Sequence, residues 1–441
     1  MNKTTFLILI AILQFSKVFP QSWQQQNVGI QVSNSGVYKI SIVDANVAWC
    51  ITNIFASVKE FSRTTDGGNT WTPGSISPIA SNAQLTGIAA IDSLTAYVCF
   101  FVPYSGGTIY KTIDGGLNWN QSGAGTVFLD SLSYPDEIYF WDAANGFTFG
   151  DPIDNVYEIY LTTDSGSTWN QVSSANIPTS TLGTISTYSP LVVMDSTIWF
   201  PSYTGNLFKS TDKGQTWTKT KIDTTVHISG LSFLDDKLHG IAVSSNYNTY
   251  LTADGGTTWN LISPIGTGPW YTIRSIPGTS YFVSVTEISG RSAYSSDMGN
   301  SWTTIDSLSP YYGLAFNDIN TGYAGGDLQS STIGGIYKWN QGTLGIRESE
   351  SIKQFIVYPN PATSIVKFSL FLSEAKSISV KIFDISGREI KSLVNEKLNA
   401  GEHSYTWNIE NEKGLHVESG MYLIKVDGAG STLSKIVTVI K

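Results

Sequence analysis

The segment Tyr110-Lys-Thr-Ile-Asp114-Gly-Gly-Leu-Asn-Trp119 largely determines the expected fold, because close copies of it recur along the chain. Each copy has a strand-like run that ends at an aspartate, a glycine two residues later and a tryptophan five residues after the aspartate. Successive aspartates are 48, 50, 48, 42 and 43 residues apart. The six pairs are Asp66 and Trp71, Asp114 and Trp119, Asp164 and Trp169, Asp212 and Trp217, Asp254 and Trp259, and Asp297 and Trp302.

The residue types of this repeat are those of a tight turn between two strands. An aspartate can accept backbone N–H groups within a turn, and a glycine adopts positive φ without a Cβ clash. The tryptophan is large enough to fill the space between neighbouring sheets. Turns repeated at this spacing are spread around a ring and do not converge on one substrate. We therefore assign the six aspartates a structural role.

A second repeated unit gives the number of blades. Each repeat is preceded by two strands. The first ends at a polar turn and the second is rich in aromatic residues, as in Ile88–Asp92 followed by Ala96–Val98. Seven such units are present, and the seventh ends near Trp339 without its last strand. The segment Ser22–Val28 resembles that missing strand. The sequence therefore predicts an all-β chain with a seven-bladed β-propeller over residues 23–340, closed by its N-terminal strand.

The repeated segment resembles the BNR or Asp-box repeat, and the longer run through strand, turn and repeat resembles propellers of the photosystem II stability/assembly-factor type. The resemblance covers about 300 residues. Sialidases, xyloglucan hydrolases and sortilin-type receptors share the repeat. The resemblance therefore implies a propeller fold, and it does not single out one of these functions.

The two ends of the chain differ from the propeller. Lys3 followed by the apolar run Phe6–Leu13 predicts a signal peptide over residues 1–22, because eight apolar residues are too few to span a bilayer. No later segment has the length and apolarity of a membrane span. Residues 341–352 form a polar linker. Alternating apolar residues over 353–441 predict a small β-sandwich.

The C-terminal module carries several short motifs, including Tyr358-Pro-Asn-Pro361 and Ser419-Gly-Met-Tyr422. In their order they resemble the type A sorting domain of the type IX (Por) secretion system. The resemblance implies a Gram-negative host, the type IX machinery as a partner, passage through the outer membrane, and removal of the module. The alternative is a carbohydrate-binding sandwich. The motif residues are Tyr358, Pro359, Asn360, Pro361, Gly387, Gly420, Tyr422 and Lys435.

Composition limits the partners of the protein. The formal net charge is −9, and residues 23–340 hold 24 acidic against 12 basic residues. This balance disfavours nucleic acids and anionic membranes, which are bound through clustered lysines and arginines. Cys50 and Cys99 lie in apolar runs and are more simply explained as buried thiols than as a disulfide. The predicted location is outside the cell or on the outer surface.

One face of the propeller is the expected binding face. It is the face opposite the Asp boxes, where aromatic residues lie in loops and can stack on sugars or anchor a protein. The alternative is that about half of them pack inward and cover the central channel. The candidate residues are Tyr104, Tyr203, Tyr247, Trp270, Tyr271, Tyr311 and Tyr312.

A glycoside hydrolase that uses the same face is the alternative function. A sialidase needs converging arginines, and only Arg63, Arg274 and Arg291 lie between residues 23 and 340. Hydrolysis also needs paired carboxylates. The best acidic group is Asp151, Asp154 and Glu158, which is interpreted either as a solvated loop or as a calcium site. The four histidines lack zinc spacing, so no cofactor is predicted beyond this calcium alternative.

Overall fold

The computed structural model describes residues 22–30, 36–52, 58–180, 190–222, 227–266, 268, 272–286, 291–307, 310–330, 333–340, 352–372, 375–384, 388–428 and 431–440. The chain divides into two compact units at residues 342 and 343. Each unit is described separately below. The predicted signal peptide over 1–22 falls almost wholly outside the described residues, as does most of the linker predicted over 341–352.

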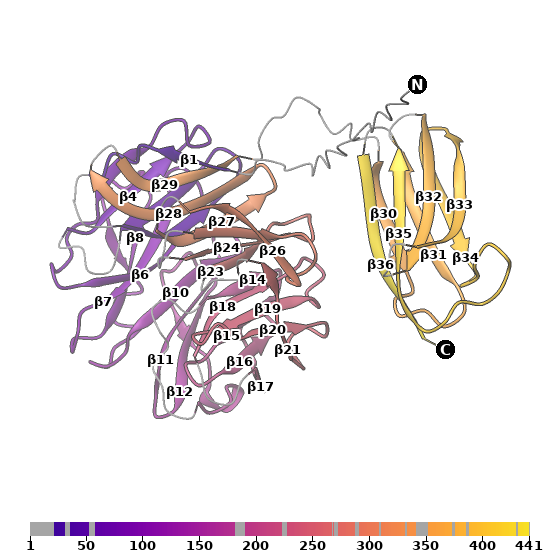
Figure 1. The fold of residues 1–441 in the computed structure, drawn as a ribbon. Helices are drawn as coiled ribbons and strands as arrows, with labels where there is room; N and C mark the ends of the chain where they lie inside the picture. Colours follow the sequence, from indigo (N-terminus) through magenta and orange to yellow (C-terminus); the bar gives the residue numbers. More distant parts are fainter. Residues whose placement is uncertain are drawn as a thin grey trace, which may run out of the picture. The chain divides into compact units, whose positions relative to one another are not determined.

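The first unit is a seven-bladed β-propeller, as the repeats predict (Figure 1). Each blade is an antiparallel sheet of four strands in sequence order, except that the last blade takes its outer strand from the N-terminus. Blades 1 to 3 comprise β2 (Val37–Ile42), β3 (Ala48–Thr52), β4 (Glu60–Thr64), β5 (Thr72–Ser75), β6 (Gln84–Ala90), β7 (Ala96–Phe101), β8 (Gly107–Thr112), β9 (Asn120–Ser122), β10 (Pro135–Phe140), β11 (Gly146–Ile153), β12 (Val156–Thr162) and β13 (Asn170–Gln171).

The later blades follow the same order. A short 3-10 turn, Ser174–Asn176, lies between blades 3 and 4, and β22 (Ile265–Gly266) adds to blade 6 in parallel with its outer strand. Blades 4 to 7 comprise β14 (Val192–Met194), β15 (Thr197–Pro201), β16 (Asn206–Ser210), β17 (Thr218–Lys221), β18 (Ile228–Phe233), β19 (Gly240–Ser244), β20 (Thr249–Thr252), β21 (Asn260–Ile262), β23 (Thr272–Ser275), β24 (Phe282–Thr286), β25 (Arg291–Ser295), β26 (Ser301–Asp306), β27 (Tyr311–Asp318), β28 (Thr321–Ser330), β29 (Ile333–Asn340) and β1 (Ser22–Gln26).

The N-terminal strand closes the ring. β1 pairs antiparallel with β29 from Ser22↔Asn340 to Gln26↔Ile336, and Figure 1 shows the two strands side by side. The predicted closure is therefore confirmed. β1 thus supplies the outer strand that the seventh blade would otherwise lack, and it covers the edge of β29.

The direction of the strands defines two faces of the propeller. The first strands of neighbouring blades contact one another around the ring, as β2 does with β27 and with β6, so these strands surround the axis. Because successive strands are antiparallel, first-to-second turns and Asp boxes share one face, which we call the Asp-box face. Second-to-third loops and the connections between blades share the other, which we call the connection face.

The Asp boxes have the hydrogen bonds of a tight turn. In blade 2, Asp114 Oδ1 accepts from the Thr112 hydroxyl (2.9 Å) and from the backbone N–H of Asn118 (3.0 Å), while Oδ2 accepts from the Asn118 amide (2.8 Å). These bonds lower the pKa of Asp114 to about 2. The other five boxes bind their turns through equivalent side-chain and backbone donors. Each carboxylate thus serves its own turn.

The Asp-box tryptophans pack between blades. Trp119 of blade 2 lies edge-on to Phe61 of blade 1, with 5.7 Å between ring centroids. Trp71 of blade 1 meets Tyr323 of blade 7 at 5.6 Å in the same way. Edge-to-face pairs at such distances are favourable beyond the apolar area that they bury. The repeated tryptophan therefore joins successive blades through a shared core.

The second unit is a β-sandwich of a three-stranded and a four-stranded sheet (Figure 1). Its sheet orders are β30-β31-β34 and β33-β32-β35-β36. Trp407 is fully buried in its core and lies edge-on to Tyr422 at 5.3 Å. The strands are β30 (Ile352–Tyr358), β31 (Val366–Leu372), β32 (Lys376–Asp384), β33 (Glu389–Leu398), β34 (Gly401–Trp407), β35 (Gly420–Gly428) and β36 (Ser431–Val439).

Candidate binding face and sorting module

Three of the candidate tyrosines project from the connection face. Tyr104 lies between β7 and β8, Tyr203 between β15 and β16, and Tyr247 between β19 and β20, so they belong to blades 2, 4 and 5. Their exposed fractions are 82%, 52% and 46%. Exposed aromatic rings of this size on one face of a rigid scaffold are suited to contact with a ligand.

Two of these tyrosines are held in an unfavourable backbone conformation. The φ angles of Tyr104 and Tyr247 are 64° and 63°, in the left-handed region that glycine or asparagine occupies at lower cost. Short turns hold them there: Tyr247 N–H donates to Ser244 O at 2.8 Å, and Tyr104 N–H donates to the Tyr134 hydroxyl at 3.0 Å. Left-handed conformations of bulky residues are typical of functional positions.

The remaining aromatic candidates do not join this group. Tyr311 is 1% exposed, and its hydroxyl donates to Asp306 Oδ2 at 2.9 Å, so the expectation that it faces a ligand is corrected by its burial. Tyr312 is half-buried and stacks on Tyr38 at 4.2 Å between centroids. Trp270 and Tyr271 lie outside the described residues.

Charged side chains from three blades meet near the axis of the propeller. Lys39 of blade 1 forms an ion pair with Glu137 of blade 3 across blade 2. Gly87 of blade 2 makes room for this pair, because a Cβ there would lie 2.8 Å from Glu137 Oε2. Burial lowers the pKa of Arg274 of blade 6, and Glu137 opposes that shift. Charges of both signs therefore lie near the axis.

The arginines do not form the group that a sialidase requires. Arg63 donates to Ser93 O in a turn of the Asp-box face, and its guanidinium lies 5.5 Å from the Trp49 ring. Arg274 lies near the axis, and Arg291 is exposed at the start of β25. Bidentate recognition of one carboxylate needs guanidinium groups that share a space. Because Arg63 is held on the Asp-box face, the three arginine side chains do not point into a common space.

The predicted acidic group is not a single site. Glu158 is buried and accepts from the Ser133 hydroxyl and from the Tyr160 hydroxyl (2.8 Å). Asp154 is exposed in the turn between β11 and β12. Burial raises the pKa of Glu158, and both its oxygens serve neighbouring side chains. Within the part of the chain that the structure describes, no three His, Cys, Asp or Glu side chains are grouped for a metal ion.

The cysteines are free, as expected from their apolar surroundings. Cys50 and Cys99 are both fully buried. Burial raises the pKa of Cys50 to about 12. Buried thiols with raised pKa values are unreactive and behave as small apolar side chains.

The Tyr358-Pro-Asn-Pro361 motif binds the last strand of the sandwich. The Asn360 amide donates to Ile436 O at 3.1 Å and accepts from Thr438 N–H at 2.8 Å, so one side chain pairs with the edge of β36 as a neighbouring strand would. Tyr422 is buried, and its hydroxyl donates to Glu418 O at 2.8 Å. Gly420 begins β35, Lys435 is exposed on β36, and Gly387 lies outside the described residues.

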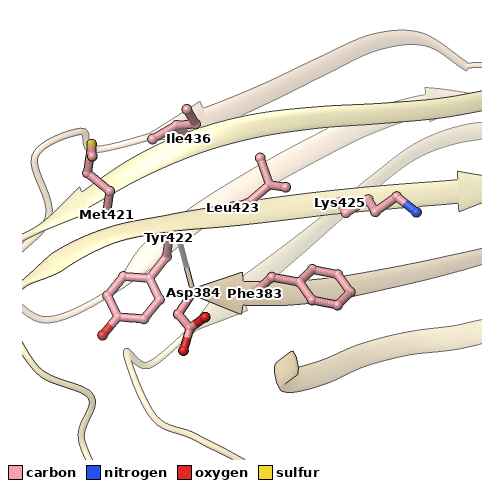
Figure 2. Close-up of a pocket in the computed structure, with 7 residues that line it drawn as sticks. All are labelled: Phe383, Asp384, Met421, Tyr422, Leu423, Lys425 and Ile436. Carbon is pink, nitrogen blue, oxygen red and sulfur yellow. The ribbon is translucent and has the colours of Figure 1, made fainter. Parts of the chain in front are cut away.

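The outer face of the four-stranded sheet is partly apolar. A shallow depression of about 480 Å³ lies there, and Figure 2 shows its side chains on β32, β35 and β36. Met421 and Ile436 are more than half exposed within it. The residues that line it are Phe383, Asp384, Met421, Tyr422, Leu423, Lys425 and Ile436.

Comparison with known proteins identifies the C-terminal module. Residues 356–440 match the secretion system C-terminal sorting domain, the Por family model. The chain ends in a type IX sorting domain. The sorting domain marks a protein that is secreted by the type IX system to the cell surface or beyond, and it implies contact with that machinery. Among the described residues, no helix is long and apolar enough to span a membrane.

Solved structures support the propeller fold. YCF48 bound to a D1 peptide is 19% identical, with 73% of this chain and 96% of that chain covered and a TM-score of 0.53. YCF48 from Cyanidioschyzon merolae is 16% identical (72% and 99% covered, TM-score 0.55), and a GH74 xyloglucanase from Xanthomonas campestris is 12% identical (80% and 60% covered, TM-score 0.50). No curated protein matches the sequence significantly. These likenesses show the fold.

Sequence analysis did not find the ion pair near the axis or the pairing role of Asn360. Lys39 and Glu137 lie 98 residues apart on blades that are not neighbours in the ring. The only local signal is Gly87, which makes room for the pair between Lys39 and Glu137, and its role depends on which blades flank it. Asn360 was found as a motif residue, whereas its bonds to β36 depend on the sandwich topology.

Proposed function

We propose that the propeller is a binding module that the type IX system delivers to the cell exterior, where it recognises an extracellular protein or glycan through the connection face. The observation that carries this proposal is the trio of exposed tyrosines, Tyr104, Tyr203 and Tyr247, on three blades of one face. Two of them, Tyr104 and Tyr247, occupy left-handed backbone conformations, which are costly for a bulky side chain.

Other features support a binding role over a catalytic one. Both oxygens of Glu158 accept from neighbouring hydroxyl groups, and Arg63 is held on the Asp-box face, so among the described residues these groups do not form a hydrolytic site with the tyrosines. The solved YCF48 structure with a D1 peptide is an example of this fold binding a peptide. The acidic balance of this chain favours ligands other than nucleic acids.

The triple variant Tyr104→Ala, Tyr203→Ala, Tyr247→Ala tests the proposal. We expect it to lose binding to the ligands that wild type retains on a glycan array and a peptide-display library, because exposed aromatic anchors contribute most of the energy at such contacts. Its Tm should stay close to that of wild type, since these side chains are solvent-exposed. Leu117→Ala, an exposed change on the Asp-box face, is the matched control. Equal binding by the triple variant and wild type would contradict the assignment of this face.

A further inference from the structure

A five-residue loop of one form recurs between the second and third strands of blades 2, 4 and 5. In each copy the N–H of the first residue donates to the carbonyl of the fifth, and the N–H of the fourth donates to the carbonyl of the first, at 2.8 to 3.1 Å. The copies are residues 102–106, 202–206 and 244–248, and each holds one of the three exposed tyrosines. The tyrosine occupies a different position in each copy, so the surroundings of the three rings differ.

In blade 4, a histidine lies behind the tyrosine of this loop. The rings of Tyr203 and His227 are stacked, with 5.0 Å between their centroids and 20° between their planes. His227 directly precedes β18, in the connection between blades 4 and 5, and its carbonyl accepts from Ser245 N–H at 2.8 Å. Ser245 belongs to the equivalent loop of blade 5. The histidine therefore joins the loops of two neighbouring blades and covers one face of the Tyr203 ring.

The imidazole acts through its ring surface and not through a hydrogen bond. Its Nε2 is buried and has no hydrogen-bond partner among the described residues. Burial also lowers the pKa of His227, so the ring is uncharged at neutral pH. A nitrogen that solvent does not reach is closed to a ligand as well. His227 is therefore a positioning residue that fixes the orientation of the exposed Tyr203 ring.

The two loops beside this pair are polar and contain no charged residue. Their sequences are Ser-Tyr-Thr-Gly-Asn over 202–206 and Ser-Ser-Asn-Tyr-Asn over 244–248. Asn246 and Asn248 are exposed, and Thr204 is half-buried. Lys221 approaches the first loop, where its ammonium group donates to Thr204 O at 2.9 Å. An aromatic surface with amide and hydroxyl groups beside it suits a ligand that has one nonpolar face and a rim of hydroxyl groups.

We propose that the Tyr203–His227 pair is the stacking subsite for a neutral pyranose ring of a glycan, bordered by the amide and hydroxyl groups of the two loops. The inference rests on the proposed binding function of the connection face and commits that face to an uncharged sugar. The C–H face of the sugar packs on the open face of Tyr203, whose other face His227 covers. Loops without arginine or lysine disfavour an anionic sugar. A single ring among neutral polar groups also fits one sugar unit better than the apolar core of a protein interface.

A glycan array probed with the full chain and matched variants tests this subsite. The array carries paired neutral and sialylated oligosaccharides, and we expect wild type to retain the neutral members. Tyr203→Ala and His227→Ala each remove one ring of the stack and should weaken this binding about tenfold. Tyr203→Phe and His227→Phe keep both rings and should bind within about threefold of wild type. Leu261→Ala, an exposed change on β21 of blade 5, is the control and should bind as wild type does.

The stability of the histidine variants gives a second readout. His227→Phe should not lower the Tm, because it replaces a buried nitrogen that lacks a partner with an apolar ring of similar shape. If His227→Ala does not fold, Tyr203→Ala carries the test, since the Tyr203 side chain is exposed.

The outcomes separate this inference from the function on which it rests. Retention of peptides without glycans, or of sialylated glycans only, would overturn the neutral-sugar subsite and leave the connection face as a binding face. His227→Ala that binds neutral glycans as tightly as wild type would remove His227 from the subsite. Wild type that retains neither a glycan nor a peptide would contradict both proposals.

Discussion

Replacing Trp23 by alanine is expected to lower the free energy of unfolding by about 3 kcal/mol, the loss that accompanies truncation of a large aromatic core side chain. Trp23 is the main apolar anchor of β1. Its ring lies 4.9 Å from that of Trp339 and 6.0 Å from that of Tyr311, and its Nε1 donates to the Ser292 hydroxyl of blade 6 at 3.1 Å. The change therefore weakens both the closing strand and its contact with the preceding blade.

Denaturant unfolding of a chain that begins at residue 22 measures this effect. Gln24→Ala is the matched control, since Gln24 lies on the same strand with its side chain exposed, and we expect it to leave stability within about 0.5 kcal/mol of wild type. Deleting residues 22–26 should be more severe, because it leaves β29 as an open edge that favours aggregation. Wild-type stability of the Trp23 variant would mean that β1 does not close the ring in solution.

Removing residues 353–441 is expected to abolish the appearance of the propeller outside the cell. The matched sorting domain covers residues 356–440, and the propeller is a separate compact unit, so the truncated protein should fold and remain in the periplasm. Cell fractionation with an antibody against the propeller measures this distribution. Normal amounts of truncated protein at the surface or in the medium would show that export uses another signal.

A single change within the module should act in the same direction. Asn360→Ala removes two hydrogen bonds to β36, which together contribute about 2 kcal/mol, so the last strand should detach more readily and export should fall. Ser404→Ala, an exposed change on β34, is the control and should leave export unchanged. Normal export of a destabilised Asn360→Ala module would show that the motif serves folding and not recognition.

The fold could be predicted from the sequence because its determinants repeat. Six copies of one turn fix the blade length, and the incomplete seventh unit together with Ser22–Val28 predicts the closure that the pairing of β1 with β29 confirms. The turn chemistry is local: the donors to Asp114 all lie within four residues of it. Local, repeated interactions are the ones that a sequence displays directly.

The candidate sites depend on contacts between distant segments. Tyr104 and Tyr311 are both aromatic residues near a loop, yet the first is exposed and the second is buried against Trp23 from the other end of the unit. Lys39 and Glu137 form an ion pair although 98 residues separate them, and nothing local to either residue indicates the other. Such positions require knowledge of which strands are neighbours.

The most direct test of the binding role follows the fate of a glycan that the propeller retains. The wild-type protein is incubated with glycans that it binds on the array, and the masses of the recovered glycans are measured by mass spectrometry. We predict saturable binding with every recovered mass unchanged, because Glu158 is engaged by two hydroxyl groups and Arg63 is held on the opposite face from Tyr104, Tyr203 and Tyr247. Recovered fragments with the mass of hydrolysis products, absent from a heat-denatured control, would contradict the account and identify the protein as a glycoside hydrolase.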